Sequence, residues 1–113
     1  MFEAGAWVLL PFPYSDASAN KRRPVLALTR PDEHGNSIGM AVSSRSHHAN
    51  VIPLHNESLI EGQLPKPSWI RTDRIVTLNA GLVIKAFAKT KSAVQRQAIS
   101  MLCEALRAQI PSA

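Results

Sequence analysis

The apolar residues of this chain occur in short runs that are interrupted by prolines and polar turn residues. Trp7 to Leu10 is followed by Pro11-Phe12-Pro13, and the run Val51 to Leu54 contains Pro53. Runs of this length are too short for helices and are typical of buried strands, and we expect Trp7 to Leu10 to form a first strand buried on both faces. The sequence therefore predicts a mainly β domain in which Pro53 marks an edge strand or a bulge.

The pattern predicts five strands and leaves a sixth open. Residues 30–37 carry Pro, Asp, Gly and Asn, so they form a turn that joins two of the strands as a hairpin. Residues 11–22 and 55–67 show no periodicity and are interpreted as loops. The predicted strands are 7–10, 24–29, 38–44, 51–54 and 68–78, while 82–88 fit either a strand or a short helical turn.

The last segment has the periodicity of an amphipathic helix. Ser92 is followed three residues later by Gln95, which is a capping-box signature. Apolar residues then recur at helical spacing, which predicts a helix from Ser92 to about Ala108, ended near Pro111. Short strands with one terminal helix indicate a small, strongly bent sheet or barrel with the helix packed on it.

The charge of the chain favours an anionic partner. Its 113 residues, expected to form one domain over 1–113, carry 13 Lys and Arg against 8 Asp and Glu, a net charge of +5 with a pI near 10.0. Nucleic acid is the leading partner and a membrane surface the second. No apolar run approaches the roughly 20 residues of a membrane span. The start Met1 to Gly5 lacks the basic region of a signal peptide, so we expect a cytoplasmic protein.

Metal and cofactor sites are not predicted. Cys103 is the single cysteine, which permits no internal disulfide and no cysteine cage. His47 and His48 are adjacent, whereas His34 and His55 are remote in sequence, a spacing that does not suit a metal site.

Arg23 stands where a cationic segment enters a strand. Lys21, Arg22 and Arg23 precede Pro24, which favours an extended conformation for Arg23. In the predicted hairpin, the start of the second strand and the end of the third lie together, so we expect Arg23 to face Ser43 and Ser44. Arg45, His47 and His48 follow directly. Cations, hydroxyls and imidazoles are thus predicted to converge at one rim, although a solvated loop end is the alternative for each of them.

Such a rim suits RNA cleavage without a metal. The ribose 2′-hydroxyl is a nucleophile already present in the substrate, so a protein must supply placement, charge and proton transfer. Arg23 is suited to neutralise the phosphorane and Ser43 to donate a hydrogen bond to it. His47 or His48 is a candidate proton donor, with an ordinary loop histidine as the alternative.

Several blocks of the sequence resemble the MazF/PemK-type toxins of bacterial type II toxin–antitoxin modules. These blocks occur in the family's order over nearly the whole chain, and the fifth is the most specific. They are Gly5, Val8-Leu9-Leu10-Pro11-Phe12, Lys21-Arg22-Arg23-Pro24-Val25, Val42-Ser43-Ser44 and Leu64-Pro65-Lys66-Pro67-Ser68-Trp69-Ile70-Arg71-Thr72-Asp73.

The resemblance implies an SH3-like, CcdB/MazF-type small β-barrel that cuts single-stranded mRNA at short sequences without a metal. It assigns Arg23 to the scissile phosphate and Ser43 to transition-state stabilisation, with Ser44 as the alternative hydroxyl. It also implies a homodimer whose RNA groove is blocked by a cognate antitoxin. The proposed RNA contacts are Lys21, Arg22, Ser44, Arg45, His47, Phe12 and Tyr14.

Two positions depart from the family pattern, and two other functions stay open. Ala6 stands where an acid often follows the early glycine, and Ser43 replaces the commoner threonine, which preserves a hydroxyl. The alternatives are a non-catalytic or gyrase-targeting CcdB-like toxin and a plain RNA-binding barrel. The latter predicts steeply salt-dependent binding without cleavage.

Overall fold

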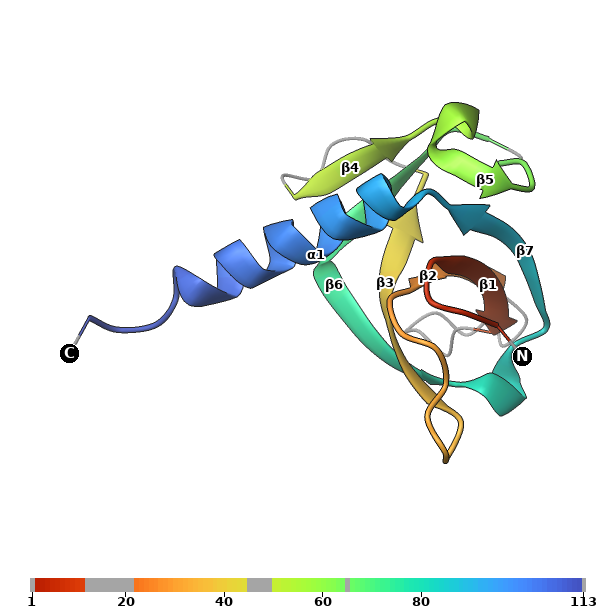
Figure 1. Cartoon of the computed structure of the whole chain (residues 1–113), viewed down its shortest axis with the longest axis horizontal. Coiled ribbons are helices and arrows are strands. Elements are labelled where there is room, and N and C mark those ends of the chain that lie inside the picture. The colour runs from red at the N-terminus through yellow and green to blue at the C-terminus, as the bar shows by residue number, and fades with distance from the viewer. Residues whose placement is uncertain (1, 12–21, 45–49, 65, 113) are drawn as a thin grey trace.

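The computed structural model describes residues 2–11, 22–44, 50–64 and 66–112, which form a strongly curved antiparallel sheet and one long helix (Figure 1). The strand order is β4-β6-β3-β2-β1-β7-β5, so β4 and β5 are the edges of the described sheet. Its strands are β1 (Ala6–Pro11), β2 (Arg22–Ala27), β3 (Asn36–Ser43), β4 (Val51–Leu54), β5 (Leu59–Glu61), β6 (Ser68–Asn79) and β7 (Lys85–Thr90).

The five predicted strands are confirmed, with boundaries shifted by one or two residues. The position of β4 at an edge agrees with the expectation from Pro53, because a proline has no N–H to give to a second neighbour. The first strand is buried on both faces as predicted, with Trp7 and Val8 at most 1% exposed. Gly5, immediately before β1, has a φ of 90°, which glycine adopts without strain.

The predicted hairpin between β2 and β3 is also confirmed. The two strands pair antiparallel, with Val25 opposite Ala41 and Ala27 opposite Gly39. In the connecting turn, the Asp32 carboxylate accepts hydrogen bonds at 2.9 Å from the backbone N–H groups of His34 and Asn36. These hydrogen bonds stabilise the ionised carboxylate, with the Asn36 N–H contributing most and the His34 N–H next. The pKa of Asp32 therefore lies below its ordinary value.

The predicted loop 55–67 contains two short elements of secondary structure. A 3₁₀ helix η1 (Asn56–Ser58) leads into β5, which pairs with β7. A three-residue strand is too short to show an alternating pattern, so no sequence signal predicts it. The ambiguous segment 82–88 resolves into the end of a 3₁₀ helix η2 (Ala80–Leu82) and most of β7.

The helix α1 (Ser92–Arg107) matches the prediction in extent but not in its cap. Its N-cap residue is Lys91, and no side chain caps the helix there, so the predicted capping box is wrong. The Gln95 side chain instead donates a hydrogen bond of 3.1 Å to the carbonyl of Leu28. This tertiary bond ties the first turn to the sheet, whereas the second half of α1 projects away from it (Figure 1).

Apolar side chains form two cores on the two faces of the sheet. The first contains Trp7, whose indole N–H donates to Thr90 Oγ1, and it includes Ala98 of α1. The second is smaller and gathers Phe2, Val8, Leu10 and Val25 with their neighbours. Because α1 is too short and too polar, no helix in the described ranges is able to cross a membrane.

Candidate nucleic-acid interface

Arg23 lies on a central strand beside a buried core. It pairs with Leu10 of β1, which is only 6% exposed, while Arg22 pairs with Pro11 and is exposed. Arg23 itself is half-buried. Residues of a strand alternate between faces, so Arg23 shares its face with Val25 and the second core. The rigid sheet therefore fixes the base of this cationic side chain.

Ser43 is brought to the same face by the strand register. Val25 pairs with Ala41, and continuing this register by two residues places Arg23 opposite Ser43. Ser43 is the last residue of β3 and is half-buried, whereas Ser44 is exposed and follows the strand end. Directly opposed residues in antiparallel strands present their side chains on one face. The geometry thus brings Arg23 together with Ser43 in preference to Ser44.

The row of opposed residues continues onto β6 and β4. Ser43 pairs with Trp69, which in turn pairs with Pro53. The sheet therefore carries a transverse row of Leu10, Arg23, Ser43, Trp69 and Pro53, which we call the site row. It combines one cation, one hydroxyl and one large aromatic ring beside a buried leucine.

An ion pair on β6 adds charge next to this row. Arg71 donates from Nε to Asp73 Oδ1 at 3.1 Å and from Nη2 to Oδ2 at 2.8 Å, a bidentate arrangement. The hydrogen bond to Asp73 raises the pKa of Arg71 above its already high ordinary value, so the guanidinium stays charged. Arg71 follows Trp69 by two residues in the regular pairing with β4, which places these two side chains on one face, and the two hydrogen bonds hold the Asp73 carboxylate beside Arg71.

A bulge explains how β6 accommodates this pair. Val42 pairs with Ile70, but Met40 pairs with Ile75, so the residues from Arg71 to Arg74 lie opposite Ala41. Thr72 secures the bulge by donating its N–H at 3.0 Å and its hydroxyl at 3.2 Å to the carbonyl of Asn50. The sequence prediction did not include Arg71 or Asp73 among the site residues. The sequence signal that could have identified Arg71 and Asp73 is that they alternate with Ile70 and Thr72 along the predicted strand.

The remaining predicted contacts cannot be placed on this surface. Arg22 and Ser44 are exposed at its margin. The other predicted residues lie outside the described ranges, namely Phe12, Tyr14, Lys21, Arg45, His47 and His48.

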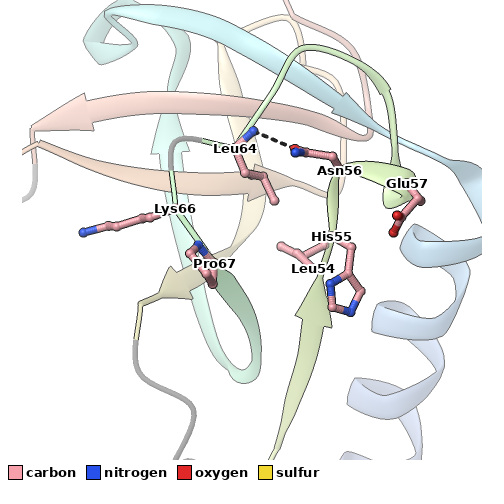
Figure 2. A pocket seen from close by; sticks show the side chains of 7 residues that line it. All are labelled: Leu54, His55, Asn56, Glu57, Leu64, Lys66 and Pro67. Atoms are coloured by element: carbon pink, nitrogen blue, oxygen red, sulfur yellow. Dashed lines mark hydrogen bonds between the residues drawn. The ribbon is translucent and has the colours of Figure 1, made fainter.

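Two open hollows lie on either side of Leu64. One is about 420 Å³ and the other about 430 Å³, and neither is lined by Arg23 or Ser43. Figure 2 shows the first, in which the Leu64 N–H donates to Asn56 Oδ1 at 3.1 Å. Its lining comprises Leu54, His55, Asn56, Glu57, Leu64, Lys66 and Pro67, and the second is lined by Leu9, Gln63, Leu64, Lys85 and Phe87.

The site row has the chemical parts for binding a phosphodiester. A guanidinium and a hydroxyl are able to donate to phosphate oxygens, and a partly exposed aromatic ring is able to stack on a base. The carboxylate of Asp73 is able to accept a hydrogen bond or a proton from a ribose hydroxyl. Among residues 2–11, 22–44, 50–64 and 66–112, no three His, Cys, Asp or Glu side chains group as metal ligands.

Comparison with known proteins identifies the family. The model of the PemK-like, MazF-like toxin of type II toxin-antitoxin system matches residues 3–110. A comparison with curated protein sequences found no match.

Solved structures of MazF toxins share the fold at low sequence identity. The Mycobacterium tuberculosis toxin MazF-mt6 has 19% identity and a TM-score of 0.66, covering 90% of this chain and 96% of its own. MazE-MazF from Deinococcus radiodurans has 19% identity and a TM-score of 0.72, with coverages of 93% and 94%. An endoribonuclease in complex with its cognate antitoxin from a mycobacterial species has 13% identity and a TM-score of 0.66, with coverages of 98% and 100%. The chain therefore belongs to the PemK-like, MazF-like toxins of type II toxin–antitoxin systems.

Proposed function

We propose that this toxin is a metal-independent endoribonuclease that cuts single-stranded mRNA at specific short sequences. The observation that carries the proposal is the register of β2 and β3, which, when extended by two residues beyond the paired Val25 and Ala41, sets the half-buried Arg23 across from the half-buried Ser43. Family membership and a structural relative described as an endoribonuclease support it. The net charge of +5 favours a polyanionic substrate.

In the proposed reaction, the ribose 2′-oxygen attacks the adjacent phosphorus and the bond from phosphorus to the 5′-oxygen breaks. The products are a 2′,3′-cyclic phosphate and a 5′-hydroxyl end. The 2′-hydroxyl gives its proton to a base of the protein, which later releases it to bulk water, and the leaving 5′-oxygen takes up a proton from bulk water, so no proton is gained or lost overall. No water and no metal are consumed in this step, so the protein contributes through positioning, charge and proton transfer.

Arg23 stabilises the charge that develops on the phosphorane, and Ser43 donates a hydrogen bond to one of its oxygens. Arg23 is assigned to charge stabilisation and not to proton transfer. We assign the acceptance of the 2′-hydroxyl proton to Asp73, which Arg71 holds on the face of the site row. We assign His47 and His48 at most a secondary role in the cleavage reaction.

The partners follow from the same proposal. Relatives from Deinococcus and mycobacteria are described with an antitoxin, which supports a cognate antitoxin as the protein partner of this toxin. A homodimer is also proposed, supported by exposed apolar side chains such as Ile38, Ile75 and Leu106, which are 40–61% exposed. The proposed location is the cytoplasm, where mRNA is available.

The proposal is tested with purified protein, defined single-stranded RNAs and EDTA, followed by chemical mapping of the ends. We expect cuts with 5′-hydroxyl ends from the wild type and cleavage at least about 100-fold slower from Arg23→Ala. Cleavage at the wild-type rate in Arg23→Ala would contradict the assignment. If the wild type cuts none of several RNAs yet inhibits gyrase supercoiling, the function is that of a gyrase-targeting toxin. Salt-sensitive RNA binding without cuts would identify a binding module.

A further inference from the structure

Trp69 is a large aromatic residue that the fold leaves outside its cores. It is only partly buried, and it belongs to neither of the two apolar clusters nor to the side chains packed against them. Trp7, in contrast, is 1% exposed and packs edge-on against Phe87. Tryptophan is enriched at sites where one face of its ring is apolar and the other is accessible, so a partly exposed indole is suited to contact a ligand.

Among the described residues, the cross-strand neighbours of Trp69 are small or already engaged, and its ring is partly exposed. Ser43 is a small side chain on one side, and Pro53 is an exposed ring on the edge strand on the other. Along β6, Pro67 is exposed, and Arg71 is held by its two hydrogen bonds to Asp73. None of these four side chains is large enough and free enough to cover an indole.

The spacing of the site row relates Trp69 to the scissile phosphate. Neighbouring strands lie about 4.8 Å apart, so Trp69 is one strand from Ser43 and roughly 10 Å from Arg23, measured between backbones. A phosphate held between Arg23 and Ser43 would place the base of an adjoining nucleotide within reach of the indole. Bases that are unpaired and splayed out are the form in which single-stranded RNA is usually recognised.

We propose that Trp69 is a stacking platform for the nucleobase next to the phosphate that Arg23 and Ser43 hold. The inference rests on the proposed ribonuclease function and adds a base-binding subsite to it. Stacking accepts any base because every base has a π-face, so Trp69 supplies affinity and places the backbone rather than reading the sequence. It does not touch the reacting atoms and is a positioning residue.

A purely structural role would have Trp69 packing on Pro53 to hold the edge strand β4. The two roles differ in their consequences for Trp69→Leu and Trp69→Phe. Packing predicts a loss of thermal stability in Trp69→Leu and unchanged affinity of the folded protein for RNA. Stacking predicts weaker RNA binding in Trp69→Leu, with substantial recovery in Trp69→Phe because phenylalanine keeps an aromatic face.

Tryptophan fluorescence reports on the subsite directly. The chain has two tryptophans, and Trp7 is buried, so changes in quenching by a ligand or by acrylamide arise mainly from Trp69. The probe is an RNA that the wild type cuts, made uncleavable by a 2′-deoxynucleotide at the cut. We expect it to quench the emission and to protect Trp69 from acrylamide.

An abasic scan then identifies the stacked nucleotide. An abasic residue is moved through the same oligonucleotide, and dissociation constants are measured by anisotropy for the wild type and both variants. Trp69→Leu should weaken binding of the intact probe roughly 5- to 100-fold, the range for one lost base–aromatic stack. At one abasic position next to the cut, the wild type and Trp69→Leu should bind equally. On cleavable RNA, KM should rise in Trp69→Leu while kcat changes less.

Several outcomes would overturn the proposal. If wild type and Trp69→Leu bind the intact probe with equal affinity, the stacking proposal is wrong, although the proposed ribonuclease function still stands. The stacking proposal is also wrong if the dissociation constants of wild type and Trp69→Leu differ by the same factor at every abasic position. Unchanged RNA affinity with weaker inhibition by the antitoxin assigns Trp69 to a protein contact instead. If the wild type neither cuts nor binds single-stranded RNA, the proposed function and this inference both fail.

Discussion

Ser43 on β3 lies directly opposite Trp69 on β6, and the register of β2 continues the same row to Arg23. A hydroxyl, an aromatic ring and a guanidinium thus come from three adjacent strands that are far apart in the sequence. Each is fixed by backbone pairing rather than by a loop, which gives the precision that a positioned catalytic group requires. This relationship carries the functional account of the toxin.

Replacement of Arg23 tests whether its guanidinium stabilises the negative charge that develops on the phosphorane. Arg23→Ala should lower kcat/KM by about 10²- to 10³-fold, the usual cost of removing one preorganised donor to a developing oxyanion. Arg23→Lys should recover only part of this, because an ammonium cannot form the bidentate contact. Arg30→Ala is the control, since Arg30 is an exposed arginine in the turn at the other end of the hairpin. Equal losses in Arg30→Ala and Arg23→Ala would contradict the assignment.

The hydroxyl at Ser43 is tested by comparison with its neighbour. Ser43→Ala should lower kcat at least about tenfold, because one hydrogen bond to the transition state is lost. Ser43→Thr should keep activity, since it retains the hydroxyl. Ser44→Ala changes the exposed residue after the strand and should affect kcat much less. A larger loss in Ser44→Ala than in Ser43→Ala would move the role to Ser44.

Asp73 is tested as the acceptor of the 2′-hydroxyl proton. Asp73→Asn keeps an oxygen that accepts from Arg71 but removes the base, so kcat should fall by roughly 10²-fold, within the range for general base catalysis. Single-turnover cleavage rates at saturating protein separate this effect from binding. Glu57→Gln is the control, because Glu57 is an exposed acid on η1 that lines a different hollow. Single-turnover rates that are unchanged in Asp73→Asn would exclude the role.

Much of the fold and part of the site were predictable from local sequence signals. The strands were visible because Trp7 to Leu10 and the alternating residues after Ser68 have the periodicity of buried strands. The hairpin prediction was sufficient to bring Arg23 towards Ser43, because a turn between antiparallel strands fixes which ends meet. These inferences needed only short-range patterns.

The features that escaped prediction depend on contacts between distant segments. The three residues of β5 are strand because β7 offers them a partner, not because of their own pattern. Gln95 binds the carbonyl of Leu28 instead of completing a helix cap, a competition that local propensity does not reveal. The ion pair of Arg71 with Asp73 depends on the bulge in β6, which follows from its pairing with β3.

The turn between β2 and β3 should give the toxin an acid-sensitive contribution to stability. The folded-state pKa of Asp32 is depressed by N–H donors, so the ionised carboxylate stabilises the fold above the unfolded-state pKa. This contribution is lost as the pH falls through the lower, folded-state pKa. Asp32→Asn should therefore unfold at a lower temperature than the wild type at neutral pH; this difference should begin to shrink below about pH 4, the ordinary pKa of Asp, and vanish only below the folded-state pKa.

Thermal unfolding followed by circular dichroism between pH 2 and 7 checks this expectation. Glu33→Gln serves as the control, because the Glu33 side chain is 85% exposed and lies beside Asp32 in the sequence. A difference between wild type and Asp32→Asn that stays constant over the whole pH range would show that the carboxylate charge is not responsible.

The most direct test of the central claim is cleavage of two matched RNAs in EDTA. They differ only in a single 2′-deoxynucleotide at the mapped cut, which removes the proposed nucleophile and leaves the phosphate in place. The account predicts that the all-RNA substrate is cut to a 2′,3′-cyclic phosphate and a 5′-hydroxyl, while the substituted one binds and stays intact. Cutting of both substrates at the same linkage would contradict attack by the 2′-hydroxyl.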